Sequence, residues 1–197
     1  MDSKTRSGSG RRPLKVRLKT ARGRTTSSQR WLERQLNDPY VEAAKREGYR
    51  SRAAYKLKEI DDKHHILKHG AVIVDLGAAP GGWSQVAAER TLSKNEARAR
   101  VVGIDLTPVE PIAGVTLIEL DFLSPDAPAR IKAELQGRPV DGVLSDMASP
   151  ATGHRETDHL RIMGLAEAAA DFAAEVLKPG GFFLCKVLQG GTERSLL

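Results

Sequence analysis

The 197-residue sequence predicts an α/β fold built on a doubly wound, mostly parallel sheet. Three observations support this prediction. Five short apolar runs rich in β-branched residues alternate with segments of helical character, which is typical of βαβ units. The first run passes through a glycine-rich turn directly into a helix. Acidic residues stand at or just after the ends of four runs, where ligands bind in open α/β sheets.

Two short helices are expected before the first strand. Residues 31–36 can form a helix that stops at Asn37-Asp38-Pro39. Val41–Glu47 can form a second helix, which ends at Gly48.

A third helix is expected within Tyr49–Ile60, with Ser51 as its candidate N-cap residue. Its buried stripe is predicted from the helical spacing of Ala53, Leu57 and Ile60. Lys56 lies about 100° of helical rotation from the centre of this stripe. From that position its ammonium group can either reach a cleft or extend over the protein surface.

The stretch Ala71–Trp83 reads as strand, tight turn and helix start, with Asp75 at the end of the strand. The glycines of the turn are spaced G-x-x-x-G-G, at Gly77, Gly81 and Gly82. This spacing is neither the dinucleotide-binding pattern nor a P-loop. A turn without Cβ atoms at these points still allows backbone to approach a ligand closely, although an ordinary β–α turn has the same composition.

Four more strands complete the predicted sheet. They are expected at Val101–Asp105, Val115–Leu120, Val140–Ser145 and Phe182–Val187. The intervening helices are expected at Pro125–Gln136 and Asp158–Leu177, the latter closed by Pro179-Gly180-Gly181. The predicted strand order is 3-2-1-4-5.

Acidic side chains follow successive strands, at Asp75, Asp105, Asp121 and Asp146. One such acid is often only a turn residue or a helix cap, but four of them on successive strands are expected to line one crevice beyond the strand ends. Lys186 stands in the last apolar run, between Cys185 and Val187. Burial there would lower its pKa from about 10.4 and make it a usable base, unless it lies at an exposed strand end.

The net charge of +6 comes from the first 30 residues. Residues 1–30 hold ten basic residues and one acid, a net charge of +9, whereas the remainder carries −3. This segment is expected to be disordered and to contact RNA phosphates. A solubility tail and an organelle-targeting peptide are the alternatives. The domain itself is expected to span residues 31–197.

Several function classes are not expected. No apolar run approaches the length of a membrane span, and no apolar segment typical of a secretory signal follows the basic start. A single cysteine, Cys185, fits a reducing cytoplasm. The five histidines have no cysteine partners at zinc spacing, so no metal site is expected.

Four motifs in this order resemble the FtsJ/RrmJ-like RNA 2′-O-ribose methyltransferases. They are Arg50–Ile60, the string DLGAAPGGWSQ from Asp75, the SDM at Ser145–Met147 and the CKV at Cys185–Val187. The resemblance covers Arg50–Gly190. It implies S-adenosylmethionine (SAM) as the cofactor and ribosomal RNA of the large subunit as the partner. A monomer in the cytoplasm is expected.

The resemblance also implies roles for individual residues. Asp105 would hold the ribose hydroxyls of SAM and Asp121 its adenine amino group. Gly81 and Trp83 would make further cofactor contacts, as would Asp146. For catalysis, Lys186 would activate a ribose 2′-hydroxyl, oriented by Asp146 and Lys56.

The implied reaction is methylation of a uridine ribose in 23S ribosomal RNA. Two alternatives stay open: an enzyme for the transfer-RNA anticodon loop, and a non-catalytic RNA-binding or ribosome-assembly protein. Family members continue past the fifth strand with a helix and two strands, the last of which carries a catalytic glutamate. Because this sequence stops at Leu197, the domain is expected to be C-terminally incomplete, with reduced stability and activity, and Glu193 does not match that glutamate.

Overall fold

The computed structural model describes residues 26, 29, 32–33, 37–92 and 100–187. The chain divides into two units, Met1–Ala43 and Ala44–Leu197. Most of the predicted basic arm and most of the predicted helix at 31–36 lie outside the described residues. No helix among the described residues is long and apolar enough to cross a membrane.

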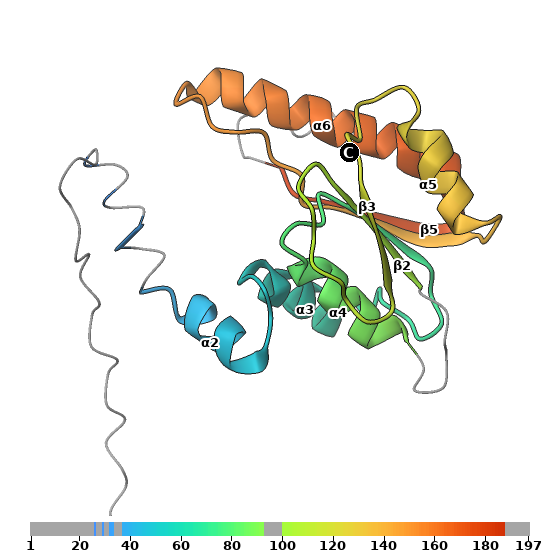
Figure 1. Cartoon of the computed structure of the whole chain (residues 1–197), viewed down its shortest axis with the longest axis horizontal. Coiled ribbons are helices and arrows are strands. Elements are labelled where there is room, and N and C mark those ends of the chain that lie inside the picture. Colours follow the sequence, from blue (N-terminus) through green and yellow to red (C-terminus); the bar gives the residue numbers. More distant parts are fainter. Residues whose placement is uncertain (1–25, 27–28, 30–31, 34–36, 93–99, 188–197) are drawn as a thin grey trace, which may run out of the picture. The chain divides into compact units, whose positions relative to one another are not determined.

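The second unit contains a five-stranded sheet with the order β3-β2-β1-β4-β5 (Figure 1). The strands are β1 (Ile73–Leu76), β2 (Val101–Asp105), β3 (Val115–Glu119), β4 (Val140–Ser145) and β5 (Leu177–Cys185). All four strand pairs are parallel, which confirms the predicted fold class and strand order.

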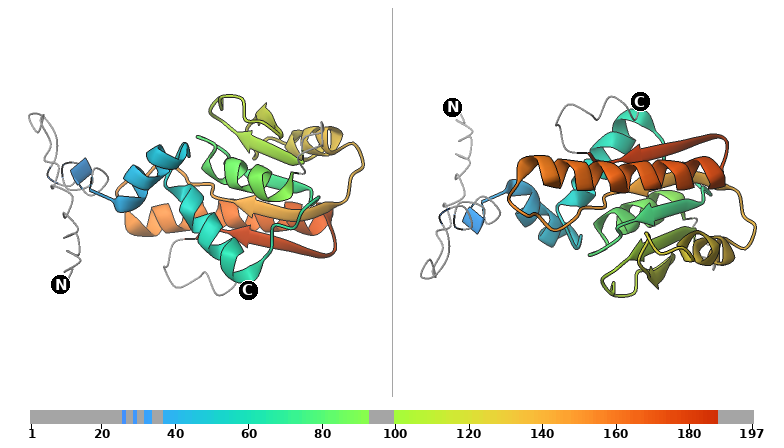
Figure 2. Two further views of the ribbon diagram at one scale, coloured as in Figure 1. Left: turned by 90° about the horizontal axis from the view of Figure 1, so that it is seen from below. Right: turned by 90° about the horizontal axis from the view of Figure 1, so that it is seen from above.

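Helices cover both faces of this sheet (Figures 1 and 2). The described helices are α2 (Pro39–Glu47), α3 (Ala53–His64), α4 (Gly82–Thr91), α5 (Ala127–Leu135) and α6 (Arg155–Val176). α3 and α4 lie against one face, and α5 and α6 lie against the other.

The core consists of two clusters, one on each face of the sheet. On β1, Val74 and Leu76 pack toward Phe172 of α6, whereas Ile73 packs toward Leu57 of α3 and the neighbouring helix. Side chains alternate between the two faces of a strand, so a strand covered on both faces must be apolar throughout. This explains why the apolar runs are continuous in sequence.

The predicted stripe of α3 is wrong in phase by one residue. The helix begins at Ala53, after Arg52, and Ser51 does not cap it. Its buried residues are Ala54, Leu57 and Asp61, whereas Ala53 and Ile60 are only half-buried. An acid can occupy the stripe because the Asp61 carboxylate accepts a hydrogen bond of 2.7 Å from the Leu67 N–H.

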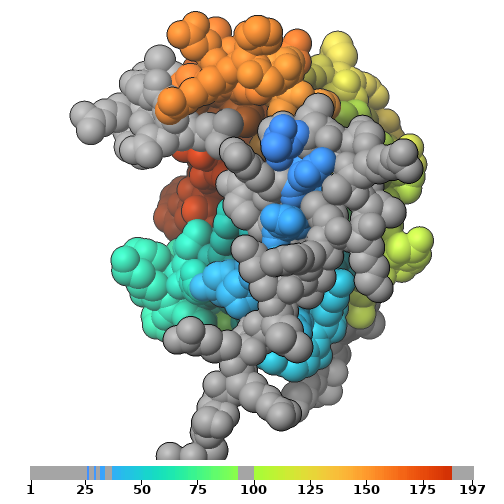
Figure 3. All heavy atoms as spheres, turned by 90° about the vertical axis from the view of Figure 1, so that its left-hand side faces the viewer, coloured from blue at the N-terminus to red at the C-terminus, as the bar shows by residue number. Residues whose placement is uncertain are grey.

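The last strand begins earlier than predicted. α6 ends at Val176, so Leu177 opens β5, and the Pro179-Gly180-Gly181 segment lies within the strand instead of closing the helix. The pairing with β4 shifts register between Val140 and Gly142 to accommodate this segment. In the space-filling view β5 is visible between α6 and the C-terminal part of α3 (Figure 3).

Candidate active site

The turn between β1 and α4 is shaped by two glycines in the left-handed region. Gly77 has a φ of 80° and Gly81 a φ of 119°. A Cβ atom on Gly77 would lie 2.8–2.9 Å from atoms of Met147, so the segment after β4 passes directly over this turn. The N–H groups of Gly77 and Ala78 both donate to the Ile104 carbonyl at 2.9 Å, which fixes the turn to the end of β2.

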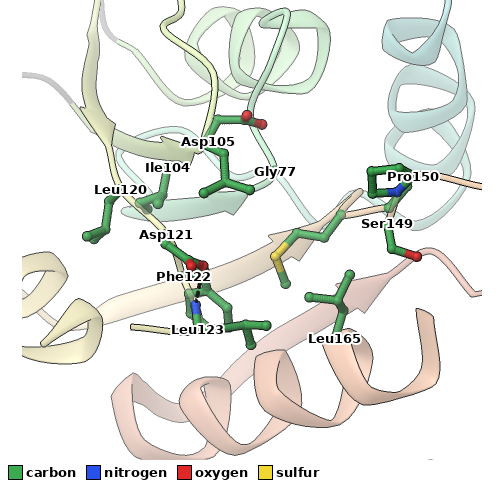
Figure 4. Close-up of a pocket in the computed structure, with 13 residues that line it drawn as sticks. Gly77, Ile104, Asp105, Leu120, Asp121, Phe122, Leu123, Ser149, Pro150 and Leu165 are labelled. Carbon is green, nitrogen blue, oxygen red and sulfur yellow. Dashed lines mark hydrogen bonds between the residues drawn. The ribbon is translucent and has the colours of Figure 1, made fainter. Parts of the chain in front are cut away.

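A cavity of about 290 Å³ opens beyond the carboxyl ends of β1, β2, β3 and β4. Asp105 and Asp121 line it together with apolar side chains, among them Met147 of the segment after β4 and Leu165 of α6 (Figure 4). A mostly apolar cavity with a few converging polar groups is the usual form of a small-molecule site. A cavity therefore lies where the crevice was predicted, and it contains two of the four predicted acids, Asp105 and Asp121, but neither Asp75 nor Asp146.

The Asp105 carboxylate is held in place by two backbone donors. Its Oδ2 accepts from the Ala79 N–H at 2.9 Å, and its Oδ1 accepts from the Thr107 N–H at 2.8 Å. Each carboxylate oxygen has a further lone pair, so Asp105 can still accept hydrogen bonds from ligand hydroxyls. Asp121 is exposed, and its Oδ1 accepts from the Leu123 N–H at 2.9 Å.

Asp75 does not line the cavity with these acids. Its side chain is fully buried, and its Oδ2 accepts a hydrogen bond of 2.6 Å from the Ser84 hydroxyl of α4. Among the described residues, Oδ1 has no hydrogen-bond partner. Burial raises the pKa of Asp75 to about 7, against the effect of the Ser84 bond and reinforced by the charges of Asp146 and Asp105.

Asp146 and Lys186 lie beside each other at the ends of β4 and β5. The Lys186 Nζ donates to the Asp146 backbone carbonyl at 2.9 Å and forms an ion pair with its Oδ1. The predicted pairing is therefore present. The prediction that Lys186 is buried inside a strand is wrong, because β5 ends at Cys185 and the Lys186 side chain is 30% exposed.

Lys56 is exposed on α3, and none of the described contacts joins it to Asp146 or Lys186. Trp83 is buried, and its indole N–H donates to the Ala53 carbonyl at 2.9 Å, which ties α4 to α3. Its side chain serves the packing of the protein, so the cofactor contact of Trp83 stays a prediction.

Two apolar residues at the mouth of the cavity were not predicted from the sequence. Leu106 and Leu123 both line the cavity, although their side chains are 67% and 61% exposed. Large apolar side chains that remain exposed beside a cavity are candidates for ligand contact. Their position one or two residues after Asp105 and Asp121 was the available signal.

Comparison with known proteins finds a family and relatives that are all described as methyltransferases. Residues 49–197 match the family described as FtsJ-like methyltransferase. A protein from Xanthobacter autotrophicus is 63% identical over 94% of this chain and 72% of its own length, and one from Parvibaculum lavamentivorans is 60% identical over 95% and 76%. Both are named Ribosomal RNA large subunit methyltransferase E.

A solved structure is similar as well. The crystal structure of a ribosomal RNA methyltransferase from Plasmodium falciparum superimposes with a TM-score of 0.68 and 35% sequence identity. The similarity covers 75% of this chain and 83% of that chain.

Proposed function

Because this chain belongs to the FtsJ-like methyltransferase family, we propose that it transfers the methyl group of SAM to a uridine ribose 2′-hydroxyl in 23S ribosomal RNA. The observation that carries the proposal is the Lys186–Asp146 pair, at the same end of the sheet as the cavity lined by Asp105 and Asp121. The names of the two relatives from Xanthobacter autotrophicus and Parvibaculum lavamentivorans support ribosomal RNA of the large subunit as the substrate.

The residues around the cavity fit SAM as the cofactor. Asp105 would accept hydrogen bonds from the ribose hydroxyls of SAM, and Asp121 would accept one from its adenine amino group. Leu106 and Leu123 offer apolar surface for the adenine ring. When bound, SAM supplies a methyl group that is already activated by a positively charged sulfonium. Acids near this end of the sheet would offset that charge.

The chemistry asked of the chain is proton removal and positioning. Lys186, in its neutral form, would take the proton of the ribose 2′-hydroxyl on Nζ. The oxygen would then bond to the methyl carbon in line with the carbon–sulfur bond, which would break and leave S-adenosylhomocysteine. The Asp146 carboxylate and carbonyl would hold Nζ at the end of β5 while this occurs. Positioning of the two reactants would supply much of the rate enhancement.

Residues outside the cavity would bind the RNA. Lys56 is exposed on α3 and would orient the target ribose, and the basic segment 1–30 would contact RNA phosphates. A monomer acting on the large ribosomal subunit in the cytoplasm is the simplest arrangement. Lys186 and Asp146 favour an enzyme over a non-catalytic RNA-binding protein, because a binder has no need of a paired lysine at this position.

The experiment is methylation of a mixture of ribosomal and transfer RNAs with labelled SAM, followed by mapping of the labelled nucleoside. The proposal predicts 2′-O-methyluridine in 23S RNA. Label in a transfer-RNA anticodon loop would support the alternative enzyme. Tight RNA binding without any label would support the non-catalytic alternative.

A further inference from the structure

Arg50 fastens the loop that follows β2. It lies between α2 and α3, and its guanidinium group reaches across to residues 106–114, between β2 and β3. Nη1 donates to the Glu110 carbonyl at 2.6 Å, and Nη2 donates to the Pro111 carbonyl at 2.8 Å. Two adjacent carbonyls thus bind the two arms of one planar guanidinium, a geometry that a lysine ammonium cannot reproduce.

The backbone that presents Arg50 is itself held by α4. The Arg50 N–H donates to the Gln85 side-chain carbonyl at 2.9 Å, and the Gln85 amide donates to the Gly48 carbonyl at 3.1 Å. Gln85 therefore fixes the turn before α3 from both sides. The backbone of Arg50 is thus anchored to α4, the helix that follows the glycine turn.

The Arg50 side chain also packs against the last part of the glycine turn. A Cβ atom on Gly81 would lie 2.7 Å from Cδ1 of Ile112 and 3.1 Å from Cδ of Arg50. The space beside Gly81 is thus occupied by one side chain from the loop and one from the segment before α3. A glycine is required here by the packing of the protein, in addition to its φ of 119°.

The loop is consequently attached to the glycine turn at both of its ends. At its start, the Asp105 carboxylate accepts from the Ala79 N–H of the turn. Toward its end, Arg50 binds Glu110 and Pro111, and Ile112 packs on Gly81. Both attachments lie on the segment that begins with Asp105 and Leu106, two residues of the cavity wall.

We propose that Arg50 is a positioning residue for the cofactor: by clamping residues 106–112 onto the glycine turn, it keeps Asp105 and Leu106 in place on the cavity wall. The inference rests on the proposed function, because it takes SAM as the occupant of this cavity. Arg50 would act on cofactor binding and leave the methyl-transfer step alone, since Lys186 and Asp146 lie at the ends of β4 and β5.

The test is Arg50→Lys, which keeps the charge and removes the planar two-armed contact. We expect the dissociation constant for SAM to rise roughly tenfold, the change that one hydrogen bond from a charged group represents. The turnover number at saturating SAM should stay within about twofold, since only uniform binding is lost. Hydrogen exchange of residues 106–112 should become faster without SAM and recover when SAM is added.

A matched control is Arg46→Lys, because the Arg46 side chain on α2 is 75% exposed and its guanidinium group forms an ion pair with Glu47, away from the loop after β2. This variant should bind SAM like the wild type. Ile112→Ala is a second test of the clamp, independent of Arg50, and it should weaken SAM binding in the same direction. If Arg50→Lys does not fold, this second variant decides alone.

The outcomes separate this inference from the proposed function. If the wild type binds SAM and both Arg50→Lys and Ile112→Ala bind it with the same affinity, the positioning role of Arg50 is overturned. The proposed function would still stand. An equal loss of turnover and affinity would also overturn it, because the effect would then reach the catalytic step. A wild-type protein that binds no SAM at all would instead contradict the proposed function.

Discussion

Asp75→Asn should change how the stability of the protein depends on pH. Asp75 is fully buried, and its pKa is raised from 3.8 to about 7, first by burial. In the unfolded chain the same carboxyl ionises near its ordinary value. Between about pH 4 and pH 7 the folded state therefore holds a proton that the unfolded state has released, so stability falls as the pH rises through this window.

The magnitude follows from the size of the shift. A rise from 3.8 to about 7 corresponds to about 4 kcal/mol at about 1.4 kcal/mol per pKa unit. Roughly 2–3 kcal/mol of this loss falls between pH 5 and pH 8. Asparagine does not titrate and can still accept the Ser84 hydroxyl on its side-chain oxygen, so the variant should lack this component. Its unpaired amide adds a cost that does not vary with pH.

Urea unfolding of wild type and Asp75→Asn at pH 5, 6, 7 and 8 measures the effect. The difference in unfolding free energy should move in favour of the variant by about 2–3 kcal/mol across this series. Asp141→Asn is the matched control. Burial raises the pKa of Asp141, but the Lys178 ion pair and the hydrogen bond from the Val72 N–H lower it by more. The contribution of the Asp141 carboxylate to stability is therefore lost only at acid pH. Wild-type and Asp75→Asn curves that run parallel from pH 5 to pH 8 would refute this reasoning.

Three further predictions test the cofactor site, the basic segment and the packing of the glycine turn. Asp105→Ala and Asp121→Ala should each weaken SAM binding about 10- to 100-fold, measured by calorimetry, because each removes a charged hydrogen-bond acceptor. RNA binding should be much less affected. Unchanged SAM affinity in both variants would show that these two acids do not bind SAM. Deletion of residues 1–30 takes away a net charge of +9 and should flatten the salt dependence of RNA binding while SAM affinity holds; an identical slope would mean that the segment does not touch RNA. Trp83→Phe loses the hydrogen bond to the Ala53 carbonyl and should lower the unfolding free energy by about 1–2 kcal/mol in urea; full stability in this variant would show that the indole does not hold α4 to α3.

Sheet residues were predictable because burial on both faces leaves a continuous apolar run. β4 has the predicted bounds, Val140–Ser145, and the order of the strands is the one that is common in doubly wound sheets. Acids in the cavity were predictable because the carboxyl ends of parallel strands meet at one edge of the sheet, where ligands bind. The cavity does contain Asp105 and Asp121. Asp75 fits the same pattern in sequence, yet its side chain faces α4, because residues on one strand alternate between the two faces.

The environments of Asp61, Lys186 and Arg50 depend on contacts with distant residues or on the exact end of a strand, which the local sequence pattern does not show. Apolar periodicity predicts Ile60 in the buried stripe and not Asp61, because it does not show that the Leu67 N–H donates a hydrogen bond to the acid. Lys186 was expected within the strand, but the strand ends one residue before it. The clamp at Arg50 joins residues about 60 positions apart through backbone carbonyls, which carry no sequence signature.

The central claim is that Lys186, paired with Asp146, removes the proton from a ribose hydroxyl in RNA. The most direct measurement compares wild type with Lys186→Ala, using 23S RNA and labelled SAM, in single-turnover methyl transfer and in SAM binding by calorimetry. The wild type should place the label on a ribose 2′-oxygen. Lys186→Ala should lose at least about 100-fold in the rate of transfer, with its SAM affinity nearly unchanged. Transfer at the wild-type rate by Lys186→Ala, or label on a base in place of the ribose, would contradict the central claim.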